Sequence, residues 1–130
     1  MANREEIDEW LSKANEDLLV CRVLLRSGEE LALPCMFHLQ QMLEKTLKAL
    51  MVAKGSRVER THDLGRLVAL AGAEDVGGLV DLCETLSLFA VATRYPGDLP
   101  SVSVAEAQAY MAEAEALREI LWERISKSEI

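Results

Sequence analysis

The spacing of apolar residues is the feature of this sequence that most restricts its fold. In residues 1–30 the apolar positions recur at alternating steps of four and three residues: Ile7, Leu11, Ala14, Leu18, Cys21 and Leu25. This spacing places their side chains along one side of an α-helix, on a face that favours burial. No segment shows the alternation of apolar and polar residues that is typical of a β-strand. The chain is therefore expected to be helical.

Capping and stop signals give the limits of the first two helices. Asn3 can cap a first helix that ends near Ser27-Gly28. A second helix is expected from about Leu31 or Pro34 to Lys54, where Gly55 stops it. The apolar stripe of this second helix consists of Met36, Leu39, Leu43, Leu47 and Leu50.

Two shorter helices are expected next. Thr61 can cap a third helix that is closed by Gly72. Asp75 can open a fourth helix that continues to Phe89, although the pair Gly77-Gly78 weakens its first turn.

The last part of the chain predicts a break and one long helix. Two prolines in the segment T-R-Y-P-G-D-L-P (93–100) interrupt any helix. Ser103 and Glu106 form a capping box that starts a final helix reaching Ile125. The expected fold is all-α: a single domain over residues 1–130, built as an up-and-down bundle of four or five helices.

Charge narrows the classes of ligand. The chain carries 14 basic and 22 acidic residues, for a net charge of −8. This balance argues against general binding to duplex DNA, which depends on neutralising phosphates. Positive charge is nevertheless concentrated in residues 45–66. This segment contains six basic and two acidic residues, a local net charge of +4. A small anionic ligand or one RNA segment fits this stretch.

Composition also bears on compartment and on metal sites. The start M-A-N-R-E-E lacks the apolar stretch of a signal peptide, and the longest uncharged run, residues 31–43, is too short to span a bilayer. The three cysteines form no CxxC pair, and only two histidines are present. We therefore expect a cytoplasmic protein with no membrane contact, no metal and no cofactor.

The second helix carries a polar stripe opposite its apolar one. The stripe consists of His38, Gln41, Lys45 and Lys48, at steps of three, four and three residues. The simpler interpretation is a solvated helix face. The alternative is one wall of a polar groove that directs two ammonium groups at an anion.

A second polar feature is the stretch R-V-E-R-T-H-D-L (57–64). Histidine is suited to act as a general acid or base near neutral pH, and His62 follows Arg57 by five positions. Arg57 or Arg60 could hold a phosphate by a bidentate contact. The stretch is therefore a nuclease site, an anion-binding site or a basic helix start without chemistry, and Asp63 could serve only to stabilise that helix start.

Four segments together resemble a known family. W-L-S-K-A-N-E-D-L (10–18), F-H-L-Q-Q-M-L-E-K-T-L-K-A-L (37–50), R-T-H-D-L (60–64) and T-R-Y-P (93–96) resemble, in this order, HEPN-domain proteins of the branch with T-H-D-L and T-R-Y-P motifs. HEPN stands for higher eukaryote and prokaryote nucleotide-binding. The resemblance implies a bundle of four or five helices that commonly forms a homodimer. It also implies nucleotide or RNA binding, and pairing with a minimal nucleotidyltransferase, sometimes as toxin and antitoxin.

The resemblance also bears on RNA cleavage. The ribonuclease branches of the family use an arginine followed four to six residues later by a histidine, after the third main helix. The arginine that matches this place is Arg94, but Asp98, Leu99 and Pro100 hold no histidine. Arg57 and His62 have a suitable spacing but precede the third helix. The resemblance therefore implies a non-cleaving member.

We expect a nucleotide- or RNA-binding and interaction module that is not catalytic on its own. Its polar stripe, the start of the third helix and T-R-Y-P should converge on one cleft, and the second and third helices should form the dimer contact. One alternative is a metal-independent ribonuclease that uses His62 with Arg57 or Arg94; another is a purely structural partner protein. The expected ligand-binding residues are His38, Gln41, Lys45, Lys48, His62, Asp63, Arg94 and Tyr95.

Overall fold

The computed structural model describes residues 3–90, 96–98 and 100–128, and all regular secondary structure in these residues is helical. This confirms the all-α fold class. The helices are α1 (Arg4–Arg26), α2 (Ala32–Ala53), α3 (Leu64–Leu70), α4 (Leu79–Ser87) and α5 (Val104–Ser128), with a short 3-10 helix at Pro96–Asp98. None of the described helices is long and apolar enough to cross a membrane.

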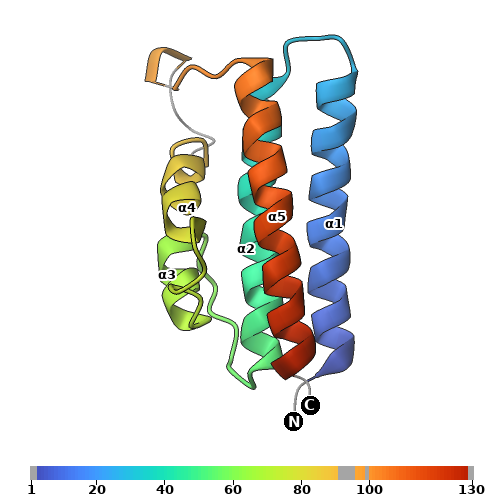
Figure 1. Cartoon of the computed structure of the whole chain (residues 1–130), viewed down its shortest axis with the longest axis vertical. Coiled ribbons are helices and arrows are strands. Elements are labelled where there is room, and N and C mark those ends of the chain that lie inside the picture. The colour runs from blue at the N-terminus through green and yellow to red at the C-terminus, as the bar shows by residue number, and fades with distance from the viewer. Residues whose placement is uncertain (1–2, 91–95, 99, 129–130) are drawn as a thin grey trace.

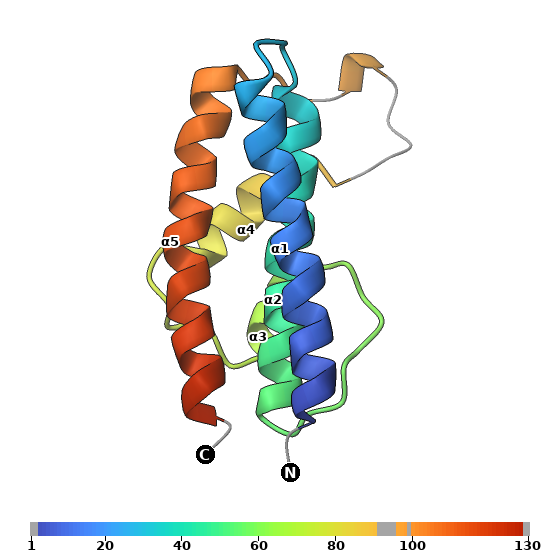
Figure 2. The ribbon, with the colours of Figure 1, turned by 90° about the vertical axis from the view of Figure 1, so that its right-hand side faces the viewer.

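The three long helices stand side by side, and the two short ones cover the remaining side of α2. Figure 1 shows α1, α2 and α5 running along the long axis, with α3 and α4 stacked end to end beside them. Figure 2 shows the same arrangement from the side, where α1 lies in front of α2. Sixteen of the 22 residues of α2 are buried, against five of 23 in α1. Because α2 packs against α1, α3, α4 and α5, it forms the centre of the core.

The first two helices and the last one begin and end close to where the sequence places them. The Asn3 side chain accepts a hydrogen bond from the Glu6 backbone N–H at 3.1 Å. Gly55 follows the end of α2 with a φ of +79°, a conformation that glycine adopts without strain. Ser103 and Glu106 form the expected capping box, with both reciprocal hydrogen bonds at 3.0 Å. These signals are local, which explains why the sequence alone predicts them.

The starts of the two short helices were predicted wrongly. Asp63, not Thr61, caps α3: its side chain accepts from the Arg66 backbone N–H at 3.2 Å, while the Thr61 hydroxyl accepts from the Asp63 N–H. Helix α4 begins at Leu79, not at Asp75. The Asp75 carboxylate instead receives two hydrogen bonds from Arg124 of α5, at 2.8 and 2.7 Å, so a tertiary contact replaces the expected cap.

Candidate functional site

The polar stripe of α2 is not a solvated face, because α1 and its side chains cover much of it. Lys48 is only 5% exposed, and its ammonium group lies 3.1 Å from the Glu44 carboxylate one helical turn earlier. The indole ring of Trp10 from α1 lies 5.3 Å from the same nitrogen. Glu44 is 3% exposed. The simpler of the two sequence interpretations is therefore wrong for this lysine, which belongs to a buried ion pair.

A second carboxylate, from Asp17 of α1, accepts hydrogen bonds from the N-terminal part of the stripe. Asp17 is 7% exposed and accepts from two residues of α2. His38 Nδ1 donates to one oxygen at 2.8 Å, and Lys45 Nζ donates to the other at 2.6 Å. Both ammonium groups that the sequence directs at an anion are thus already paired with carboxylates.

His62 is joined to the same side of α2 although it lies outside any helix. Its Nδ1 is 3.0 Å from Glu44 Oε1, and its backbone carbonyl accepts from Gln40 Nε2 at 3.3 Å. The Gln41 amide in turn donates to Gln40 Oε1 at 2.7 Å. The His62 side chain nevertheless remains 82% exposed. The connection between α2 and α3 is therefore held against α2 while it presents an imidazole to solvent.

These contacts form two similar units, which together we call the paired-charge network (Asp17, His38, Glu44, Lys45, Lys48 and His62). In each unit a buried carboxylate is shared by one lysine and by the Nδ1 of one histidine. Because a carboxylate only accepts hydrogen bonds, Nδ1 carries a proton in both rings and Nε2 is left for an external group. With neutral imidazoles the two carboxylates and two ammonium groups sum to zero charge.

Two positive charges on the connection between α2 and α3 have no carboxylate partner among the described residues. Arg57 and Arg60 are exposed and line a shallow hollow together with Glu6, Val58 and Glu59. Within the described part of the chain neither arginine belongs to an ion pair.

The other basic groups near this hollow are occupied. Arg66 is paired with Glu59, and this hydrogen-bonded contact lowers the pKa of the Glu59 carboxyl. Lys54 donates to the Ala71 carbonyl at 2.7 Å. Arg57 and Arg60 therefore remain as exposed cations without a described carboxylate partner, on the same connection as the exposed imidazole of His62.

The sequence-predicted site residues divide into three groups. Lys48 and His62 meet at Glu44, while His38, Gln41 and Lys45 continue the same side of α2. Asp63 is the cap of α3. Arg94 and Tyr95 lie outside the described residues, so the expected convergence of T-R-Y-P with the stripe stays a prediction.

Sequence reasoning missed the role of two residues. Asp17 was not among the candidates, although its place next to Leu18 and one turn before Cys21 sets a carboxylate at the border of the apolar stripe. Glu44 was not among the candidates either, and it is the partner of both Lys48 and His62. Among the described residues, no group of three or more histidine, cysteine, aspartate or glutamate side chains is arranged to hold a metal ion.

Comparison with known proteins gives one family and one solved structure. The family model described as HEPN domain matches residues 7–125. The chain is also similar to the crystal structure of the protein TT1696 from Thermus thermophilus, with 26% sequence identity and a TM-score of 0.66. That similarity covers 94% of this chain and 97% of the other. No curated protein gives a significant sequence match.

Proposed function

Because this chain belongs to the HEPN domain family, we propose that it is a nucleotide- or RNA-binding and interaction module that does not cleave RNA on its own. In this proposal it acts as a homodimer and pairs with a minimal nucleotidyltransferase as toxin and antitoxin. The partner and the pairing follow from the family resemblance. The ligand site rests on the contacts described above.

The observation that carries the proposal is that the α2–α3 connection exposes His62 and two arginines that no described carboxylate pairs. Glu44 holds the His62 Nδ1 at 3.0 Å, which orients the ring and leaves Nε2 toward solvent. Arg57 and Arg60 are exposed on the same connection. An arginine binds phosphate oxygens through two parallel N–H donors, so this segment suits one or two phosphates of a nucleotide or RNA strand.

The lysines of the stripe have a supporting role in this proposal. Lys45 and Lys48 neutralise Asp17 and Glu44, the carboxylates that hold the two histidines. Without the ammonium groups, two buried negative charges would repel a phosphate. Lys45, at 23% side-chain exposure, is the one with room to contact a ligand as well. Gln41 and His38 border it on the same side of α2.

Several features argue against cleavage. RNA hydrolysis without metal needs an acid and a base, each within about 3 Å of its oxygen or one water away. Each histidine is bound by a different carboxylate, on Asp17 and on Glu44, and these come from different helices. The arginine–histidine pair of the ribonuclease branches is missing after Arg94. His62 is therefore proposed as a binding residue.

Binding is tested with a fluorescently labelled single-stranded RNA in chelating buffer. Arg57→Ala/Arg60→Ala is expected to weaken binding about tenfold and to reduce the slope of log K against log salt by roughly 1.4, since each single-strand phosphate contact contributes about 0.7. Lys127→Ala, which removes an exposed cation from α5, is the control and should change neither quantity. Equal weakening by both variants would reject the site.

Cleavage is tested on the same RNA by gel electrophoresis. Wild type and His62→Ala should both leave the strand intact in chelator. Cleavage by wild type that His62→Ala abolishes would overturn the binding proposal and would establish a metal-independent ribonuclease. Absence of both binding and cleavage would leave the purely structural partner as the remaining function.

A further inference from the structure

Two cysteines from different helices meet in the core between α1 and α2. The Cys21 thiol donates a hydrogen bond to the Cys35 backbone carbonyl, with 3.3 Å between sulfur and oxygen. Both residues are 0% exposed, and both are free cysteines in this structure. They are 14 positions apart, on opposite sides of the turn that joins the helices, so it is the packing of α1 on α2 that brings them together.

The two thiols differ in reactivity. The hydrogen bond between their side chains lowers the pKa of Cys35 and raises the pKa of Cys21. Cys35 also lies in the first turn of α2, where the positive end of the helix dipole favours a thiolate. Cys21 follows the Asp17 carboxylate by one turn of α1, and this negative charge favours the neutral thiol. Cys35 is therefore the sulfur that an oxidant attacks first, because the thiolate is the nucleophile.

The spacing of packed helices suits a disulfide at this level. Axes of packed helices are about 8–10 Å apart, and each Cα atom lies about 2.3 Å from its axis. Cα atoms that face each other are therefore about 3.5–5.5 Å apart, which overlaps the range of about 4.4–6.8 Å found in disulfides. Two thiols in contact on facing helices need little backbone movement to form the bond.

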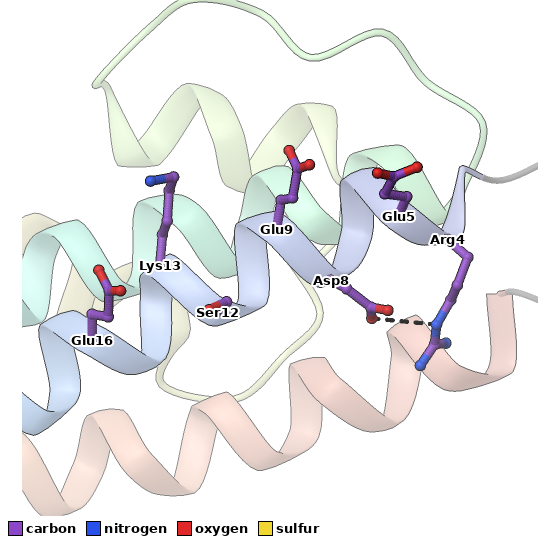
Figure 3. Close-up of a pocket in the computed structure, with 7 residues that line it drawn as sticks. All are labelled: Arg4, Glu5, Asp8, Glu9, Ser12, Lys13 and Glu16. Carbon is purple, nitrogen blue, oxygen red and sulfur yellow. Dashed lines mark ion pairs between the residues drawn. The ribbon is translucent and has the colours of Figure 1, made fainter.

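The orientation of Cys21 favours a bond within one chain. Figure 3 shows the outward side of α1, where a shallow depression is lined by exposed polar side chains such as Glu9 and Ser12. Cys21 belongs to the opposite, buried side of the helix, which contacts α2. The sulfur is thus turned toward Cys35 and away from other molecules.

A small oxidant reaches the pair through the start of α2. The N-cap residue of this helix, Leu31, makes no side-chain hydrogen bond to the first turn. Pro34, in the same turn, has no backbone N–H to contribute. An uncapped first turn opens at a lower free energy than the rest of the core, and its opening exposes Cys35.

We propose that Cys21 and Cys35 are an oxidation site, at which a peroxide converts the two thiols into a reversible disulfide between α1 and α2. The Cys35 thiolate attacks one oxygen of hydrogen peroxide, the O–O bond breaks, and Cys35 becomes a sulfenic acid with release of hydroxide. The Cys21 sulfur then attacks the Cys35 sulfur, the S–O bond breaks, and the Cys21 proton leaves with the hydroxyl group as water. The hydroxide takes up the proton that Cys35 had lost. The two sulfurs thus give up two electrons, and peroxide is reduced to two molecules of water.

The disulfide fastens one end of the paired-charge network. Asp17 precedes Cys21 by one helical turn, and His38 follows Cys35 by three positions, so the bond closes beside the hydrogen bond from His38 to Asp17. It also closes the chain over residues 21–35 and removes freedom from the unfolded state. The oxidised chain is therefore expected to be the more stable one. This inference does not rest on the proposed ligand, and its test needs none.

The experiment treats the folded full chain with excess hydrogen peroxide, alkylates the remaining thiols in denaturant and maps the peptides by mass spectrometry. Wild type should lose two of its three free thiols, with Cys21 and Cys35 in one linked peptide, and a dithiol reductant should restore both. Cys83 is the internal control: it is also buried, burial raises its pKa to about 12, and it should stay reduced. The oxidised chain should melt about 10 °C higher than the reduced chain.

Three variants test the order of the two steps, and circular dichroism checks that each one folds. Cys21→Ser should accumulate a sulfenic acid on Cys35, detected with a sulfenic-acid reagent, because no second thiol resolves it. Cys35→Ser should leave Cys21 reduced, and Cys83→Ser should form the disulfide as wild type does. Oxidation of Cys83 as fast as Cys35, linked peptides that join only separate chains, or three thiols left intact in wild type would overturn the proposal.

Discussion

Replacing Lys48 with methionine tests whether the Glu44–Lys48 pair is buried as the structure has it. Two unit charges 3.1 Å apart attract by about 5 kcal/mol at an effective dielectric constant of about 20. Removing one member of a buried pair costs about 3–5 kcal/mol, because the other charge stays desolvated. His62 Nδ1 lies 3.0 Å from the same carboxylate, and its hydrogen bond offsets part of this loss of stability. We therefore expect Lys48→Met to lower the free energy of unfolding by about 3 kcal/mol.

The assay is urea unfolding followed by circular dichroism, arranged as a double-mutant cycle with Glu44→Gln. The double variant buries no charge at this place, so the coupling between the two changes should exceed about 2 kcal/mol. Glu123 and Lys127 of α5 provide a matched control: they have the same order and spacing at 3.0 Å, but their side chains are 66% and 72% exposed. The coupling free energy in their double-mutant cycle should be less than about 0.5 kcal/mol. Equal coupling in both cycles would refute the argument that burial sets the strength of the pair.

Two further predictions concern the turn before α4 and its contact with α5. Gly78→Ala should destabilise the fold by about 1–2 kcal/mol in urea unfolding, because Gly78 has a φ of +82°. Gly77 does not have a positive φ, and a Cβ added there would meet open space. A loss of stability in Gly77→Ala as large as that in Gly78→Ala would therefore contradict the reasoning. The hydrogen bonds from Arg124 lower the pKa of Asp75 from 3.8 to about 2. A depressed carboxyl pKa stabilises the fold above the unfolded value and ceases to do so as the pH falls through the folded one. The difference in urea midpoint between wild type and Arg124→Met should therefore shrink as the pH is lowered from about 5 to about 2, and a constant difference would show that the contact is not ionic.

The sequence determined the long helices because their signals are local. The apolar steps of four and three residues, the Asn3 cap and the capping box of Ser103 and Glu106 all act within one or two turns. The start of α4 was missed because Asp75, a good capping residue by type, forms its hydrogen bonds with Arg124, 49 positions later. A pattern within one or two helical turns cannot show a hydrogen-bond donor that lies so far along the chain.

The candidate site shows the same division. The sequence placed His38, Lys45 and Lys48 on one face of a helix, and this placement follows from the helical repeat alone. Whether that face met water or protein was decided by α1, which brings Asp17 to His38 and Lys45 from 21 and 28 positions away. Packing α1 on α2 removes water from the stripe, and an ammonium group that loses its water must gain a carboxylate. Tertiary structure therefore paired the lysines internally and left the arginines of the α2–α3 connection exposed.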